Sequence, residues 1–188
     1  MPESSDYDEL RHGSHGVSLI GDLTTDSGRQ LLEDLAASPP DCPLLVEITT
    51  AGGDAEMARL IVQELDRLRD RRPSLRFLGK TQVYSAGVTI MSAFLPPDRL
   101  LTRDTVLLIH GRQLDKTVEI SGPMRASLAK VEALKAQLEL GCRLENENFT
   151  RLIKDTGVEM DDLVERALHN WYLTAEEALS LGLVGSLV

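Results

Sequence analysis

The chain has 188 residues, of which 42% are hydrophobic and 27% are charged, and these proportions are typical of one globular domain rather than of a disordered chain. Its formal net charge of -10 is poorly suited to binding nucleic-acid phosphates. No apolar run is long enough to cross a bilayer, and the acidic start lacks the pattern of a signal peptide. The two cysteines, Cys42 and Cys142, show no metal or disulfide spacing. We therefore expect a cytoplasmic protein without a metal, a cofactor, a nucleic-acid partner or a membrane partner.

The first half of the sequence predicts strands that alternate with helices. Residues 1–15 are rich in serine, glycine and acid, and we expect a flexible arm there. An alternating segment predicts a strand over 16–20, and the leucines of 27–38 predict a helix with Ser27 as its cap, ended by the Pro39–Pro40 pair. The apolar run 43–49 is typical of a buried parallel strand, and apolar residues recur at helical spacing from 57 to 68.

The second half continues the alternation and adds one long helix. We expect strands over 74–79 and 105–110, with a helix that begins near Ser85 between them. From Pro123 onward, apolar residues at three- and four-residue spacing, from Met124 to Leu138, predict a long amphipathic helix. Two short helices follow over 160–168 and 174–182, the second with a capping box of Thr174 and Glu177 and a stop at Gly182.

This pattern indicates an α/β fold with a largely parallel sheet. In such folds function gathers in loops at the strand ends, which here hold Gly52 and Gly53, Ser85 and His110. Each residue also has an ordinary structural interpretation: the glycines permit a sharp turn, Ser85 is a helix cap, and His110 ends a strand with its polar tip in solvent. Asn170 is typical of a turn, and His169 beside it is a rival for any role of a histidine.

Three segments in order, "TTAGGDAEMARLI", "QVYSAGVTIMSAF" and "RDTVLLIHG", together resemble the ClpP family of serine peptidases, the proteolytic subunits of Clp proteases. The family pattern is a Gly-Gly turn after a strand, a serine before small residues at a helix start, and a histidine that closes a later strand. Ser85 and His110 are 25 residues apart, and the ending "WYLTAEEALSLGLVGSL" also resembles the family. The resemblance covers roughly residues 16–188.

The resemblance implies the ClpP/crotonase-like fold, with repeated strand–strand–helix units and a protruding long handle helix. It implies one domain over residues 16–188, including a handle region at about 112–155. By position, Ser85 resembles the nucleophile, His110 the general base, and Gly53 and Ala86 the oxyanion-hole donors through their backbone N–H groups. The family's third triad residue, an aspartate, corresponds here to Asn170.

The resemblance also implies partners and an assembly: a peptide or unfolded-protein substrate, heptameric homo-oligomeric rings stacked as a tetradecamer, and an AAA+ ATPase unfoldase as a candidate partner. Several positions depart from the family pattern. Ala51 stands where a proline usually precedes the Gly pair, Gly111 and Arg112 replace Gln-Pro, and the segment that follows is longer and poorer in glycine.

Three functions remain open at this stage. A serine endopeptidase would use acyl-enzyme chemistry. A ring subunit with weak or no activity would serve as a scaffold or regulator, an alternative that Asn170 favours and that the presence of both Ser85 and His110 opposes. A crotonase-type acyl-CoA enzyme shares the architecture and the oxyanion hole but does not need this Ser/His pair.

Overall fold

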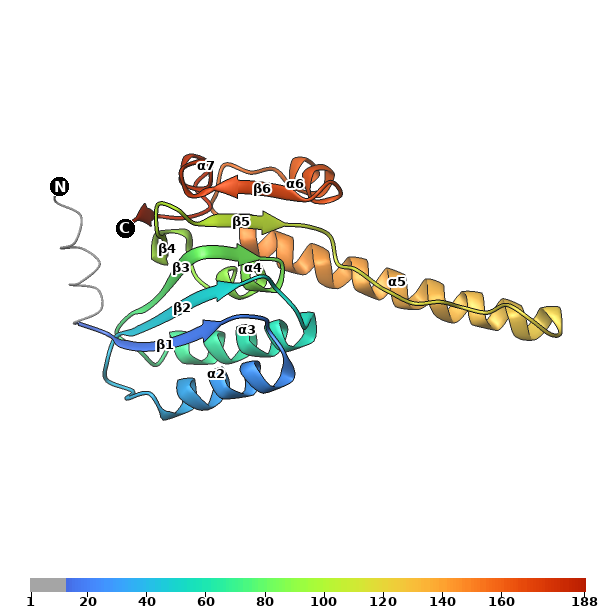
Figure 1. Ribbon diagram of the computed structural model, residues 1–188, viewed down its shortest axis with the longest axis horizontal. Helices are drawn as coiled ribbons and strands as arrows, with labels where there is room; N and C mark the ends of the chain where they lie inside the picture. The colour runs from blue at the N-terminus through green and yellow to red at the C-terminus, as the bar shows by residue number, and fades with distance from the viewer. Residues whose placement is uncertain (1–12) are drawn as a thin grey trace.

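The computed structural model describes residues 13–188, which form a seven-stranded sheet with helices packed against it (Figure 1). The elements in chain order are β1 (His15–Ile20), α2 (Thr25–Ala37), β2 (Leu44–Thr50), α3 (Ala55–Arg69), β3 (Leu75–Tyr84), α4 (Ala86–Met91), the 3-10 turn η1 (Pro96–Asp98), β4 (Arg99–Leu101), β5 (Val106–Ile109), α5 (Met124–Ile153), α6 (Met160–Ala167), β6 (Trp171–Thr174), α7 (Ala175–Ser180) and β7 (Ser186–Leu187).

The sheet is parallel except at one edge. Its strands run in the order β1-β2-β3-β4-β7, all paired in parallel, and β5 pairs with β3 on one side and antiparallel with β6 on the other. The predicted α/β class with a largely parallel sheet is therefore confirmed. Parallel strands of this kind are covered on both faces, and β2 is accordingly buried almost without interruption.

Strand β3 serves two neighbours in succession. Its first half, Phe77 to Gly79, pairs with β4, and its last residues, Gln82 to Tyr84, pair with β5. Between the two halves Thr81 has a positive φ of 60°, which bends the strand. This bend directs the end of β3 toward β5, so that Ser85 follows a strand end next to His110.

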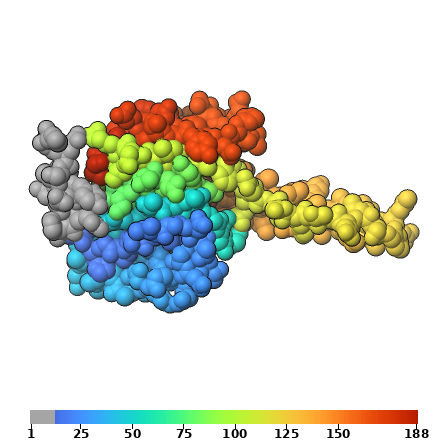
Figure 2. Space-filling view, in the orientation of Figure 1, coloured from blue at the N-terminus to red at the C-terminus, as the bar shows by residue number. Residues whose placement is uncertain are grey.

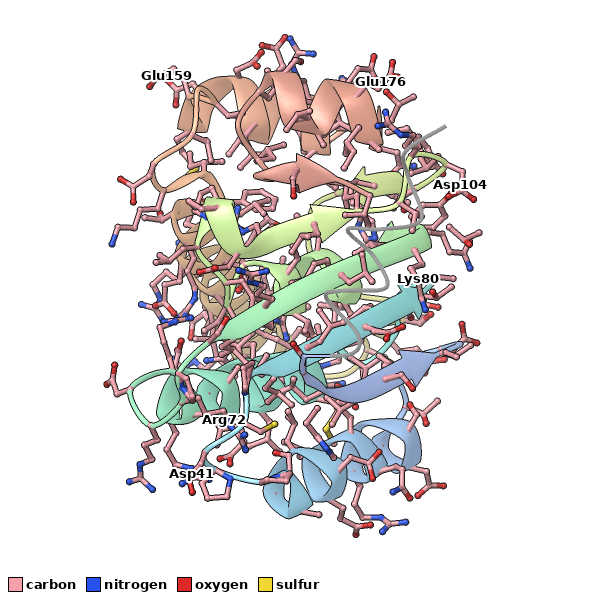
Figure 3. The ribbon with its side chains drawn as sticks, turned by 90° about the vertical axis from the view of Figure 1, so that its left-hand side faces the viewer. Asp41, Arg72, Lys80, Asp104, Glu159 and Glu176 are labelled. Atoms are coloured by element: carbon pink, nitrogen blue, oxygen red, sulfur yellow. The ribbon has the colours of Figure 1, made fainter. Side chains whose placement is uncertain are left out.

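Helices α2 and α3 bury their apolar faces against the β1–β2 part of the sheet. Leu31 and Leu35 of α2, and Ile61 and Leu65 of α3, are at most 1% exposed and belong to the main core. Seen from the side, α2 and α3 lie at one end of the sheet, whereas α6 and α7, marked by Glu159 and Glu176, lie beyond β6 at the other (Figure 3).

Helix α5 projects away from the body of the molecule as a handle (Figure 2). An extended segment after His110 runs beside α5 to the far tip of the handle, where Pro123 precedes the first residue of the helix (Figure 1). The apolar stripe of this helix is not packed in the core of the described chain, because Met124 is 90% exposed and Leu128 is 59% exposed. Only the last part of the helix, at Phe149 and Leu152, enters the core.

Some local predictions need correction. Thr24, rather than Ser27, caps α2: its hydroxyl accepts the Ser27 N–H at 3.2 Å, and Ser27 Oγ accepts the Thr24 N–H at 2.9 Å in return. The strand predicted over 74–79 extends to Tyr84, and the short strands β4, β6 and β7 were not predicted at all. The capping box of Thr174 and Glu177 is confirmed.

The arm predicted over residues 1–15 lies outside the described residues up to position 12, and its last residue already begins β1. Within residues 13–188, no helix combines the length and apolarity needed to cross a membrane.

Candidate active site

A cavity of about 410 Å³ lies where β2, β3 and β5 end and where the inner part of α5 crosses them. Ser85, His110, Gly53 and Ala86, four of the five predicted site residues, line it together. Residues of α5 complete its wall, and polar and apolar side chains are mixed in its lining. Its lining includes Val88, Ile109, Leu144, Phe149 and Leu152. The parallel arrangement of the strands therefore brings loops that are far apart in sequence to one cavity at the strand ends.

Ser85 occupies a backbone conformation that L-residues avoid. Its φ is 52° and its ψ is -109°, and it forms no side-chain cap bond with helix α4, which it precedes. Its N–H donates to the Leu108 carbonyl at 2.9 Å, and its own carbonyl accepts from Val88 and Thr89 at 3.0 and 3.2 Å. Such a conformation costs about 1–3 kcal/mol and tends to persist at functional sites. The interpretation of Ser85 as an ordinary N-cap is therefore wrong, because its side chain caps nothing.

The glycine pair makes room for this serine. A Cβ on Gly52, whose φ is 109°, would lie 2.8 Å from Ser85 Cβ and 3.3 Å from Ser85 Oγ. A Cβ on Gly53, whose φ is 136°, would lie 2.2 Å from the Leu23 carbonyl oxygen. The turn thus needs glycine at both positions, for its positive φ angles and for close packing.

Two backbone N–H groups in this cavity have no hydrogen-bond acceptor among the described residues. Leu23 fixes the turn, since its N–H donates to the Gly52 carbonyl at 2.7 Å and its carbonyl accepts from Asp54 at 2.8 Å. Within residues 13–188, the N–H groups of Gly53 and Ala86 donate to no protein acceptor. Preorganised donors of this kind stabilise the negative oxygen that develops during acyl transfer.

His110 is half-buried at the end of β5, and its Nδ1 lies 2.7 Å from the carbonyl oxygen of Gly111. Among the hydrogen bonds of residues 13–188, none joins His110 to Ser85 or to Asn170. In enzymes without substrate, catalytic hydrogen bonds are often long and tighten only in the complex. Ser85 and His110 thus share one cavity, with no hydrogen bond between them in this conformation.

Asn170 is not in this cavity. It is exposed with a φ of 60°, and it lines a separate hollow with His169, Trp171 and Tyr172. The antiparallel register of β5 and β6 ends at the pair Ile109 and Trp171, so that one further step would place His110 opposite Asn170. The backbone therefore places the two residues near each other, but no hydrogen bond joins the Asn170 side chain to the histidine among the described residues.

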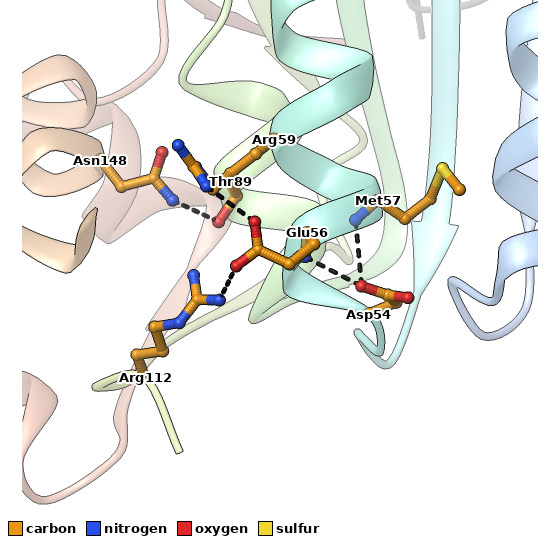
Figure 4. A network of polar contacts seen from close by, with 7 residues as sticks. All are labelled: Asp54, Glu56, Met57, Arg59, Thr89, Arg112 and Asn148. Atoms are coloured by element: carbon orange, nitrogen blue, oxygen red, sulfur yellow. Dashed lines mark hydrogen bonds and ion pairs between the residues drawn. The ribbon is translucent and has the colours of Figure 1, made fainter. Parts of the chain in front are cut away.

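Polar residues around the start of α3 and beside the cavity tie the handle to the body (Figure 4). Glu56 binds Arg59 at 2.7 Å and also pairs with Arg112, which follows β5. Asn148 of α5 donates to Thr89 Oγ1 of α4 at 2.8 Å. Burial alone would raise the pKa of Glu56, but the hydrogen bond from Arg59 and the charge of Arg112 together hold that pKa below its ordinary value.

Two site residues were not predicted from the sequence. Glu145 and Asn148 lie on α5 and line the cavity, although they are 35 and more residues beyond His110 in sequence. Their polar side chains look like ordinary exposed helix positions, so that no local pattern distinguishes them. Within residues 13–188, no group of three or more His, Cys, Asp or Glu residues is arranged to hold a metal ion.

The chain is similar to proteolytic subunits of Clp proteases. The ATP-dependent Clp protease proteolytic subunit 2 of Treponema pallidum is 27% identical over 178 residues, which span 92% of this chain and 81% of that protein. The ATP-dependent Clp protease proteolytic subunit 3 of Rhizobium meliloti is 26% identical over 180 residues, or 93% of this chain and 84% of that protein. No protein-family model matches the chain.

A solved structure shares the fold. An asparagine-to-aspartate mutant of ClpP1 from Listeria monocytogenes superposes with a TM-score of 0.73 over 97% of this chain and 94% of that chain, at 17% identity. This similarity confirms the predicted fold class, including the long projecting helix.

Proposed function

The chain belongs to the ClpP family, and from this premise we propose that it is a serine endopeptidase that cleaves peptides or unfolded proteins through an acyl-enzyme. The observation that carries the proposal is the strained Ser85, which shares a cavity with His110 and with two unpaired backbone donors. A buried helix cap would need neither the strain nor the free donors.

In the proposed mechanism, Nε2 of His110 takes the proton of Ser85 Oγ as the oxygen attacks the scissile carbonyl carbon. The N–H groups of Gly53 and Ala86 bind the oxyanion of the tetrahedral intermediate. Collapse of this intermediate breaks the C–N bond, and His110 passes the proton to the departing amine. A water molecule, deprotonated by His110, then attacks the ester carbonyl on Ser85. His110 returns that proton to Ser85 Oγ as the C–O bond breaks, which releases the acid product and restores the enzyme.

We retain Asn170 as the proposed third member of the triad, on the basis of its position in the sequence and its place in the β5–β6 register. Its side chain would have to turn toward His110 to accept the Nδ1 proton. An asparagine oxygen can orient a histidine but brings no charge to stabilise the imidazolium. Slow activity is therefore expected.

The proposed assembly is a homo-oligomer of heptameric rings stacked as a tetradecamer. It is supported by the exposed apolar stripe on α5, which includes Leu128, Val131 and Leu138 and is costly to leave in water. The relatives are named as subunits of ATP-dependent proteases, and an AAA+ ATPase unfoldase is proposed as a partner on that basis.

A second candidate function is that of a ring subunit with little or no activity. It is favoured by the absence of a hydrogen bond between Ser85 and His110 in the described residues and by the position of Asn170 outside the cavity. A third candidate, an acyl-CoA enzyme of the crotonase type, would use the oxyanion donors without Ser85.

Turnover measurements separate the three candidates. We expect the wild-type chain to hydrolyse fluorogenic peptides slowly, and Ser85→Ala and His110→Ala to lose this turnover; in a complete triad such losses are about 10^6 in kcat. Ser180→Ala and His169→Ala, which change exposed residues outside the cavity, serve as matched controls. Peptide turnover that survives Ser85→Ala would exclude the proposed mechanism, and turnover of acyl-CoA thioesters without peptide turnover would favour the crotonase type.

A further inference from the structure

The peptide group between Gly111 and Arg112 links the active-site histidine to a carboxylate on the handle. Its carbonyl oxygen lies 2.7 Å from His110 Nδ1. Its N–H donates to the Oε2 atom of Glu145. One planar amide thus stands between an imidazole and a carboxylate, with a hydrogen bond on each side.

This arrangement determines which imidazole nitrogen carries the proton. A carbonyl oxygen can only accept a hydrogen bond, so Nδ1 must donate. In the neutral ring Nε2 is then left with its lone pair, which is the state that a general base needs to take a proton from Ser85. In this conformation the Gly111 carbonyl therefore takes the place at Nδ1 that Asn170 would occupy only after turning toward His110 in the proposed triad.

Glu145 adds a negative charge to the far side of the same peptide group. Hydrogen bonds in a chain polarise one another, so the carboxylate makes the Gly111 carbonyl a stronger acceptor. The Arg112 guanidinium does not neutralise this carboxylate, because it pairs with Glu56 instead. Among residues 13–188, Glu145 takes part in no ion pair, and it is half-buried.

The residues after His110 suit the link. A Cβ at Gly111 would lie 3.2 Å from Glu145 Oε2, which is tight, so that glycine permits the close approach of the carboxylate. Arg112 supplies an N–H, which the proline of the family pattern at that position would lack. Glycine at 111, arginine at 112 and asparagine rather than aspartate at 170 thus fit one arrangement. The Gly111–Arg112 peptide group orients His110, and the Glu145 carboxylate behind it supplies the negative charge.

We propose that Glu145 is a positioning residue that acts through the Gly111–Arg112 peptide group to hold His110 in its Nδ1–H tautomer and to stabilise the imidazolium. The proposal rests on the proposed function of Ser85 and His110. It differs from the opposite interpretation, in which the Gly111 contact holds His110 away from Ser85 and Glu145 restrains activity.

The tautomer can be measured without activity. Imidazole ¹⁵N shifts of histidine-labelled protein are recorded at about pH 9, above the ordinary histidine range, with His110→Gln to assign the signal. We expect an Nδ1–H tautomer in the wild-type chain and in Glu145→Gln, whose amide oxygen still accepts the Arg112 N–H. We expect a shift toward Nε2–H in Glu145→Ala. An unchanged tautomer in a folded Glu145→Ala would overturn the proposal.

The rate of Ser85 labelling by a fluorophosphonate gives the second readout. Removing an outer partner that orients a metal-bound histidine costs about 10- to 100-fold in activity. We expect a loss of similar size for Glu145→Ala, in the labelling rate and in kcat for peptides, with KM unchanged. Glu145→Gln should recover part of the rate, because it keeps the acceptor and lacks the charge. Glu147→Ala, at an exposed position on the same helix, is the matched control.

The outcomes are distinguishable. Faster labelling of Glu145→Ala would show that the contact restrains His110, and it would overturn the positioning role. If Ser85 is not labelled even in the wild-type chain, the proposed function fails, while the tautomer measurement still decides whether Glu145 orients His110.

Discussion

Gly52→Ala tests whether the glycine turn exists to accommodate Ser85. The new Cβ would lie 2.8 Å from Ser85 Cβ, so the serine would have to move by about 0.6 Å to reach an ordinary contact of 3.4 Å. The φ of 109° adds backbone strain of about 1–3 kcal/mol, which lowers the free energy of unfolding. Displacement of a reacting group by 1 Å costs about 10^2 in rate, so we expect a loss of about 10- to 100-fold.

Gly21→Ala is the control that separates backbone strain from displacement of Ser85. Gly21 has a φ of 97°, and a Cβ added there would meet no atom within 4 Å, so this variant carries similar strain without touching the serine. Urea unfolding should show comparable losses of stability in both variants. Phosphonate labelling, expressed per folded molecule, should be slow in Gly52→Ala alone. Equal labelling rates in the two folded variants would refute the proposed steric role of the turn.

Three further predictions concern the triad, the core and the assembly. Asn170→Asp should speed acylation of Ser85 by about 10- to 10^3-fold, worth about 1.4 to 4 kcal/mol, whereas His169→Ala should leave the rate nearly unchanged; the reverse result would show that the triad has been assigned to the wrong residues. Arg99→Met should lower the free energy of unfolding by about 3 kcal/mol in urea titrations, because the side chain donates to the carbonyls of three separate segments and its loss leaves them unpaired; an unchanged midpoint would contradict this. Sedimentation at micromolar concentration should give the mass of stacked rings of seven, and Leu128→Glu should lower it, whereas a wild-type monomer or simple dimer would exclude the assembly.

Replacing Arg99 has two opposing effects on the free energy of unfolding. Burial holds the pKa of Arg99 at about 10, below its ordinary value, with a further contribution from the charge of Arg151. The folded state therefore disfavours the charged form, and this penalty is present at neutral pH and would be relieved only as pH rises above about 10. We expect the loss of three hydrogen bonds to outweigh the relief of this penalty in Arg99→Met.

The elements that the sequence predicted well are those whose own pattern is strong. The apolar run of β2 and the helical spacing of α3 and α5 are local features that packing reinforces. The short strands β4, β6 and β7 carry little pattern of their own and form because partners lie beside them. The end of β3 is largely polar, and it forms a strand because it pairs with β5 on one side and, at Val83, with β2 on the other.

For the site, position in the fold was more predictable than side-chain contact. The loops of Gly53, Ser85 and His110 meet because parallel strands end at one edge of a sheet. Asn170 lies at a positive-φ turn and lines another hollow, and no local sequence pattern reveals that placement. Glu145 reaches the site from a helix that returns from a distant part of the chain, and only the three-dimensional path of α5 shows it.

The central claim, that Ser85 is an activated nucleophile, is tested most directly by intact mass after treatment of the folded protein with a fluorophosphonate. We expect one adduct per chain, mapped by peptide sequencing to Ser85 and absent from Ser85→Ala. An adduct at another residue, or none on a folded wild-type chain, would contradict the claim.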